Sequence, residues 1–301
     1  EINTSIDEIF VPAAESLAAL LKRDDFAGIE TASKTWERQL RNLSFRGWPV
    51  DGMLPSHELL NQVQTGDVDI SAIRMTTQPN VSTALLWMQR GRANRAKLLV
   101  LNDETWDEWS DIWKRTISGA APQVKQREFI TKQIDHDTAL VVFVPRGQGP
   151  YLWTDDAKKA NQIRRRFCLL GQTQDAMRIW DIRQATRLLR KKLPDAPLEL
   201  RATGTAAGLT LYASLFEPAP ERLSLAGLAR SHRNGPTLMN VLRFMDIPHA
   251  VAMAASRGPL EIAVAPHSVW DQLADDVRKL GVLVTEDNNA TIATFLLAPE
   301  E

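Results

Sequence analysis

The segment RATGTAAGL, residues 201–209, places two glycines four positions apart, between an apolar stretch and a helix-like apolar segment. This order is typical of a strand, a very tight turn and a helix. When such a turn has the form G-x-S-x-G, it holds a strained serine whose hydroxyl is exposed for nucleophilic attack. Here Gly204 and Gly208 occupy the glycine positions, and Ala206 stands where the serine would be. The pattern predicts the backbone of a nucleophile-bearing turn without the nucleophile.

Nucleophilic catalysis also needs a base, and the sequence contains five histidines. His232 follows Ser231 in a polar loop, where an imidazole could accept a proton. No two histidines have the H-x-x-H or H-E-x-x-H spacing, and a single cysteine excludes a cysteine-based zinc cluster. No complete glycine-rich phosphate loop is found either. We therefore expect neither a metal nor another cofactor.

Three other features are expected to be structural. Trp106, Trp109 and Trp113 lie at helical core spacing, which predicts burial rather than sugar stacking. Cys168 has apolar neighbours, which predicts a buried thiol. The three arginines at 164–166 form one basic turn, which predicts a solvated or ion-paired helix face.

The composition is that of an ordinary soluble globular protein, with 44% apolar and 24% charged residues in 301. The net charge of -1 gives no indication of a nucleic-acid or anionic-membrane partner. The longest apolar runs fall short of the roughly 18–20 residues that span a bilayer, so we expect no membrane-spanning segment. The chain begins at Glu1 without an initiator methionine, and we expect it to be part of a longer protein.

Strands and helices alternate along most of the chain. The apolar patterns predict strands over 69–78, 81–90, 96–103, 137–150, 198–205 and 259–266, with further terminal strands over 282–287 and 291–297. They predict helices over 35–43, 104–117, 157–192, 206–218 and 268–280. Such alternation is typical of a mostly parallel sheet with helices on both faces. We predict a three-layer α/β/α sandwich over 66–301, preceded by an N-terminal extension over 1–65 that packs on it.

Residues 177–218, MRIWDIRQATRLLRKKLPDAPLELRATGTAAGLTLYASLFEP, resemble the central block of bacterial acetyl xylan esterases, in the cephalosporin deacetylase-like branch of the α/β-hydrolase superfamily. In that block a helix leads into the G-x-S-x-G-G turn. Residues 141–150 resemble the family's strand that ends in D-x-R-G-x-G, and residues 242–265 resemble a later strand entry. The matching helix positions are Trp180, Asp181, Arg183, Ala185 and Leu189.

The resemblance implies an α/β-hydrolase fold in which a serine attacks an ester carbonyl, a histidine takes its proton and an acid orients the histidine. It places the turn at residues 204–208, namely Gly204, Thr205, Ala206, Ala207 and Gly208, with the serine position at Ala206. It places oxyanion-hole backbone donors at Ala207 and Asn102. No histidine follows His267, and Asp271 is the only residue near the acid's place.

The resemblance and these departures together predict a catalytically degenerate domain. We expect it to be the C-terminal structural or binding part of a larger acetyl xylan esterase-like protein, with an active hydrolase domain as partner and a carbohydrate as ligand. The family implies a bacterial, secreted or periplasmic protein. Two alternatives stay open. One is an active carboxylic ester hydrolase of the carbohydrate deacetylase type with a relocated site at Ser231, His232 and His267. The other is a carbohydrate-binding module that uses exposed tryptophans.

Overall fold

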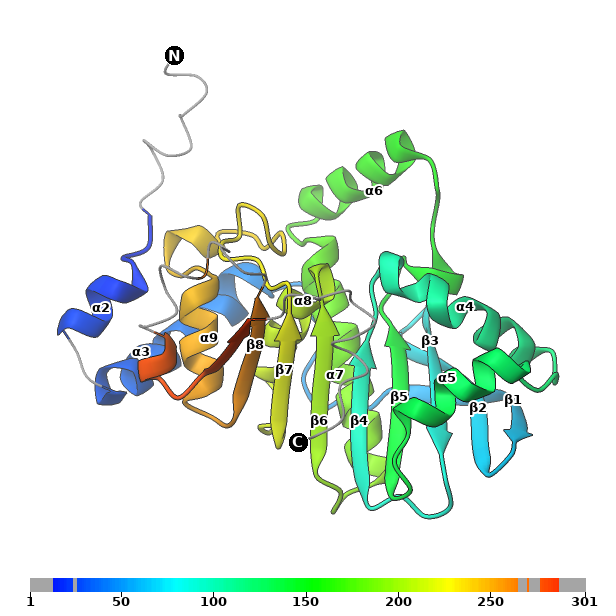
Figure 1. The fold of residues 1–301 in the computed structure, drawn as a ribbon. Coiled ribbons are helices and arrows are strands. Elements are labelled where there is room, and N and C mark those ends of the chain that lie inside the picture. Colours follow the sequence, from blue (N-terminus) through cyan, green and yellow to red (C-terminus); the bar gives the residue numbers. More distant parts are fainter. Residues whose placement is uncertain (1–12, 24–25, 265–269, 271–276, 287–301) are drawn as a thin grey trace.

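The computed structural model describes residues 13–23, 26–264, 270 and 277–286, and these form one sheet with helices on both faces (Figure 1). The nine strands lie in the order β1-β2-β3-β5-β4-β6-β7-β8-β9. Their bounds are β1 Ser56–Thr65, β2 Val68–Gln78, β3 Val81–Gln89, β4 Arg95–Val100, β5 Thr138–Val144, β6 Leu198–Thr203, β7 Arg222–Ala226, β8 Leu260–Val264 and β9 Leu283–Glu286.

The sheet is antiparallel at one edge and parallel over the rest. Strands β1, β2, β3 and β5 pair antiparallel, whereas every neighbouring pair from β5 through β4 to β9 is parallel. The central strand β4 is buried between β5 and β6, with Leu98 opposite Val141 on one side and Leu200 on the other. The predicted three-layer architecture with a mostly parallel sheet is confirmed.

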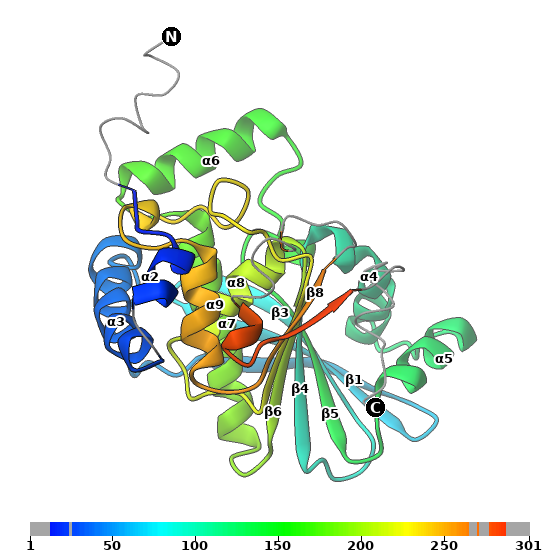
Figure 2. The same cartoon turned by 60° about the vertical axis from the view of Figure 1, so that its left-hand side comes forward.

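Helices α3, α7, α8 and α9 cover one face of the sheet, and α4 and α5 cover the other (Figures 1 and 2). Residues of period two on the strands divide between these faces: Ile73 and Leu85 pack with the first group, and Ile70 and Leu86 with the second. The helical bounds are α2 Leu17–Arg23, α3 Phe26–Gln39, the π-helical turn η2 Leu40–Ser44, α4 Asp103–Ile117, α5 Val124–Gln133, η3 Gly149–Tyr151, α6 Ala157–Leu169, α7 Gln174–Lys192, α8 Thr205–Ser214, η4 Val241–Arg243 and α9 Ile247–Ala255.

The tryptophans follow the core interpretation with one exception. Trp109 and Trp113 are buried under α4, and Trp180 is buried under α7. Trp106 is half-buried and contacts Trp113. Trp153 is 42% exposed. Most of the aromatic surface that a tryptophan-based sugar platform would need is therefore inside the fold.

The segment predicted as a long helix over 157–192, with a break or kink at Gly171 or Thr173, is two helices. Gly171, at φ +71°, separates α6 from α7, and its carbonyl accepts a hydrogen bond from Arg46 Nε at 3.2 Å. None of the residues of α6 is buried. The prediction of a buried thiol at Cys168 is wrong, because this helix stands away from the core and exposes the cysteine.

Two strands were not predicted. Strand β1 pairs with β2 along its whole length, so the sheet already begins within the range assigned to the N-terminal extension. Strand β7 lies between β6 and β8. Of the rest of that extension, Trp36 and Leu40 pack into the core beside α9. The predicted strand at 291–297 lies outside the described residues, as does most of the helix predicted at 268–280. No helix in the described ranges is both long and apolar enough to cross a membrane.

A buried ion pair joins three distant segments of the chain. Asp181 on α7 has no exposed side-chain surface, and Arg146, in the loop after β5, is almost as deeply buried. Arg146 Nη2 and Nε donate to the two Asp181 carboxylate oxygens at 2.6 and 2.8 Å. Thr77, near the end of β2, donates its hydroxyl to Asp181 at 2.6 Å and accepts from Trp180 Nε1 on its carbonyl at 3.0 Å. Both carboxylate oxygens of Asp181 therefore accept hydrogen bonds.

Replacing Asp181 with alanine should destabilise the fold strongly, because the Arg146 guanidinium would remain buried without a counter-charge. We expect D181A to lower the free energy of unfolding by about 3–5 kcal/mol, measured by urea denaturation. The matched control is D111A. It breaks an ion pair with Lys114 in which both side chains are exposed, and should cost at most about 1 kcal/mol. Equal losses in the two variants would contradict this account of the buried pair.

Candidate functional site

The turn between β6 and α8 reaches its apex at Gly204. This residue has φ +55° and ψ −127°, and it lies between Thr203, the last residue of the strand, and Thr205, the first of the helix. The apex is thus two residues before the predicted nucleophile position. Ala206 is inside the first turn of α8 and is buried, with 1% of its surface exposed. The turn therefore has its apex at Gly204 and not at Ala206, the residue that the resemblance places at the serine position.

The sequence pattern misplaced the apex because it matched Gly204 and Gly208 to the two glycines of the motif, whereas these residues have different structural roles. Gly204 takes a positive φ that side chains rarely adopt. Gly208 has no such φ. A side chain there would begin 2.6 Å from Pro236 Cγ, so this glycine lets the loop after β7 approach α8. With the apex at Gly204, the flanking small residues of the motif are Ala202 and Ala206. The signal that could have found this is the A-T-G-T-A spacing.

The two predicted oxyanion donors are already engaged. The Ala207 N–H donates to Gly204 O at 3.1 Å. The Asn102 N–H donates to Thr105 Oγ1 at 2.9 Å, within the capping box of α4. Neither N–H is available to a ligand in this arrangement. The Thr205 N–H, at the first position of α8, has no hydrogen-bond partner in the part of the chain that the structure describes, as expected for a helix N-terminus.

The Asn102 side chain lies beneath the apex. Its Oδ1 caps α4 by accepting from the Thr105 N–H at 2.9 Å. Its Nδ2 is buried and has no partner among the described residues. A side chain on Gly204 would begin 3.2 Å from this Nδ2. An unsatisfied buried donor costs about 1–3 kcal/mol, so its presence under the turn marks a place where an acceptor would be favourable.

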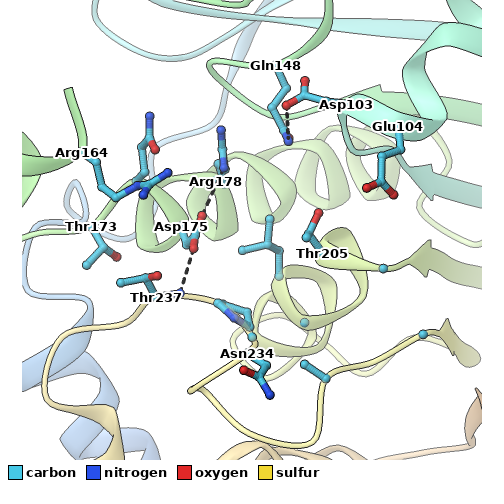
Figure 3. Close-up of a pocket in the computed structure, with 18 of the residues that line it drawn as sticks. Asp103, Glu104, Gln148, Arg164, Thr173, Asp175, Arg178, Thr205, Asn234 and Thr237 are labelled. Carbon is cyan, nitrogen blue, oxygen red and sulfur yellow. Dashed lines mark hydrogen bonds and ion pairs between the residues drawn. The ribbon is translucent and has the colours of Figure 1, made fainter. Parts of the chain in front are cut away.

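A cavity of about 580 Å³ opens above the apex, and we name it the elbow cavity (Figure 3). Its walls come from α4, the loop after β5, helix α6, the start of α7, the start of α8 and the loop after β7. The lining is mostly polar and carries charges of both signs. It includes Asp103, Glu104, Gln148, Arg164, Asp175, Arg178, Thr205, Asn234 and Thr237.

Hydrogen bonds hold the polar walls of the elbow cavity in place. Asp175 accepts from Arg178 Nη1 at 3.2 Å and from the Thr237 N–H at 2.8 Å, which joins α7 to the loop after β7. Arg178 Nε also donates to Arg146 O at 3.2 Å. Gln148 Nε2 donates to Asp103 at 3.4 Å. The cavity is therefore built from side chains that already have partners within the fold.

His232 is close to the elbow cavity but is committed to internal contacts. Its Nδ1 lies 2.6 Å from Pro236 O, so this nitrogen carries the proton and donates. Its Nε2 then accepts from the Tyr212 hydroxyl at 2.6 Å. Burial lowers the pKa of His232 and raises that of Tyr212 well above its ordinary value, which keeps both groups neutral. Both ring nitrogens of this candidate base are occupied.

Ser231 makes no hydrogen bond to the His232 ring within the described residues; its Oγ accepts from the Arg233 N–H at 3.3 Å. His267 and Asp271 lie outside the described residues. Among the described residues, no group of three or more His, Cys, Asp or Glu side chains is arranged to hold a metal ion. The structure thus brings Gly204, Thr205 and Asn102 together, and it does not join Ser231 to His232 as a catalytic pair.

No protein-family model matches the sequence, and no curated protein matches it. Solved structures do match, at low identity. A crystal structure from Bacteroides fragilis, assigned as an acetyl xylan esterase, superposes with a TM-score of 0.67 and 10% identity. The match covers 96% of this chain and 82% of that one. A glucuronoyl esterase from Solibacter usitatus gives 0.58 and 12%, covering 96% and 99%. A methylesterase gives 0.63 and 9%, covering 93% and 65%.

These similarities establish the fold. The chain has the α/β-hydrolase fold of carbohydrate-type esterases, as the resemblance in its sequence implied. Coverage of nearly the whole chain means that the similarity includes the antiparallel edge and the strands up to β9. In this fold the nucleophile sits on the sharp turn between a strand and a helix.

Alanine at Gly204 should destabilise the protein through the backbone and through contact with Asn102. The φ and ψ of this residue cost a side-chain-bearing residue about 1–3 kcal/mol. We expect G204A to lower the unfolding free energy by that amount in urea denaturation. The control is G66A, at φ +64° in a turn where a new side chain meets no atom within 4 Å. A loss in G204A no larger than in G66A would argue against the tight packing under the apex.

Proposed function

We propose that this chain is a non-hydrolytic α/β-hydrolase-fold domain that binds acylated carbohydrate in the elbow cavity. The observation that carries the proposal is Gly204 at the apex of the turn. A residue without a side chain at this position cannot attack an ester carbonyl, whatever else surrounds it.

No suitably placed base is found among the described residues, which supports the same proposal. A serine hydroxyl is a weak nucleophile until an adjacent base takes its proton. The sequence contains no histidine after His267. His232 holds its ring nitrogens in hydrogen bonds to Pro236 and Tyr212. Ser231 therefore has no activating partner in the described structure, which disfavours the relocated site.

The binding capacity of the cavity rests on the start of α8. The Thr205 N–H points from a helix N-terminus, where the aligned peptide dipoles produce a partial positive charge. Such a group favours the oxygen of an acyl carbonyl. Carboxylate, amide and hydroxyl side chains around the cavity suit a ligand with many hydroxyls. The names of the structural neighbours, esterases of carbohydrate substrates, agree with this ligand class.

The proposal includes a partner. We propose that the domain serves as the binding part of a larger esterase-like protein, holding the acylated substrate for an active hydrolase domain. This role needs only that the cavity retain acyl groups without cleaving them.

The purified chain should not hydrolyse p-nitrophenyl acetate. We expect release of p-nitrophenolate, followed by absorbance at neutral pH, to equal that of buffer and to be the same in S231A. This variant is the control because Ser231 is the serine of the alternative, relocated site. Turnover above buffer that S231A abolishes would contradict the proposal and establish the relocated active site.

Removing the Thr205 N–H should weaken binding of acetylated xylo-oligosaccharides. Proline is tolerated at the first position of a helix, and T205P deletes the donor, whereas T205A keeps it. By isothermal titration we expect T205P to raise Kd by about 3–10-fold and T205A to leave it near the wild-type value. Alkali-deacetylated oligosaccharides should bind the wild-type chain more weakly by a similar factor. Equal affinity for the acetylated and deacetylated oligosaccharides would show that the acetyl group does not contribute to binding, and would contradict the proposal. Circular dichroism checks that both variants fold.

A further inference from the structure

Helix α6 and the segment before it expose an unusual amount of apolar surface. Leu169 is 86% exposed and Leu170 is 73% exposed at the end of the helix. Leu152 is 49% exposed and Trp153 is 42% exposed in the segment that leads into it. The Trp153 ring stacks on Phe167 of α6, with ring centroids 5.7 Å apart, which ties the preceding segment to the helix. We name these five residues the α6 patch.

The same helix is strongly basic. Its sequence, AKKANQIRRRFCL, contains five lysines and arginines and no acidic residue. The chain as a whole has a net charge of -1, so the cluster is local. It includes the arginines at 164–166, the basic turn for which the sequence predicts a solvated or ion-paired helix face. The basic side chains are Lys158, Lys159, Arg164, Arg165 and Arg166.

Helix α6 is also placed where a large flat partner could reach it. It projects beyond the carboxyl ends of the strands and forms an outer edge of the molecule in both views (Figures 1 and 2). None of its residues is buried. Its attachment to the body is narrow, through the Trp153–Phe167 stack and the hydrogen bond from Arg46 to Gly171.

We propose that α6 and the α6 patch bind the surface of an anionic lipid bilayer. Helix α6 carries leucine and phenylalanine beside lysine and arginine, and a tryptophan lies in the segment before it. Helical segments of this composition bind at the boundary between lipid headgroups and acyl chains. The apolar groups enter the acyl boundary and the basic groups meet anionic headgroups.

Other occupants fit less well. A stable protein partner would need an interface of at least about 1,000 Å² whose centre is poor in charge, whereas five of the 13 residues of α6 are cationic. A nucleic acid would use the arginines but would leave exposed leucines unaccounted for. This inference goes beyond the proposed function, because it concerns the outer surface of α6, whereas Arg164 on the same helix lines the elbow cavity.

The test is co-sedimentation of the whole chain with vesicles of phosphatidylcholine alone and of phosphatidylcholine with 30% phosphatidylserine. We expect binding to the anionic vesicles only, weakened as salt rises. R165Q/R166Q should weaken it about tenfold or more, and K34Q/K114Q, which removes two exposed lysines elsewhere, should not. L169S/L170S should also weaken it, whereas V50S, at an equally exposed position, should leave it unchanged.

A second readout reports the patch directly. Trp153 fluorescence should shift to the blue on anionic vesicles, and W153F should remove most of the shift. Equal binding to neutral vesicles, no binding to either, or binding that none of the α6 variants weakens would overturn the proposal. So would a change from dimer to monomer in L169S/L170S by light scattering, which would make the patch an interface between copies. The binding experiment with T205P does not depend on whether α6 binds vesicles. A negative result with vesicles therefore leaves the elbow-cavity proposal standing.

Discussion

The buried ion pair between Asp181 and Arg146 is the constraint on which the rest of the site depends. Two charges inside a protein are tolerated only when their hydrogen bonds are nearly complete, and here the Thr77 hydroxyl and the Arg146 N–H complete those of the carboxylate. The pair fixes the loop after β5 against α7. That loop carries Gln148, and the start of α7 carries Asp175 and Arg178. One internal contact therefore positions two of the walls of the elbow cavity relative to each other.

On the proposed function, the turn at Gly204 keeps a hydrolase-type backbone without the chemistry. A serine at such an apex stores strain of about 1–3 kcal/mol, and it is retained for its exposed hydroxyl. Glycine takes the same φ and ψ without that penalty. The helix N-terminus behind the turn still presents the Thr205 N–H to the cavity. On the proposed function, the turn offers a preorganised donor for an oxygen atom and no side chain that can form a covalent bond to the carbon attached to it.

Much of the fold could be predicted from the sequence, because buried parallel strands appear as continuous apolar runs, as in residues 139–144, and α4 has its apolar residues on one stripe. The mostly parallel pairing followed from the alternation of strands with helices. Strand β7 escaped because RLSLA is short and its pairing is decided by neighbours distant in sequence. Burial was harder to predict than secondary structure. Cys168 sits among apolar residues and is exposed, because no residue of its helix is buried.

The sequence pattern predicted the turn between a strand and a helix, but it placed the apex of this turn two residues too late. The glycines suggested an apex at Ala206, and only the backbone angles show that Gly204 occupies it. The most direct test of a non-hydrolytic acyl-binding cavity is a crystal structure of the chain grown with an acetylated xylo-oligosaccharide. The account predicts an intact acetyl ester in the elbow cavity, with its carbonyl oxygen within hydrogen-bond distance of the Thr205 N–H. Free acetate with a deacetylated sugar, an acetyl group on Ser231, or a ligand bound away from α8 would contradict it.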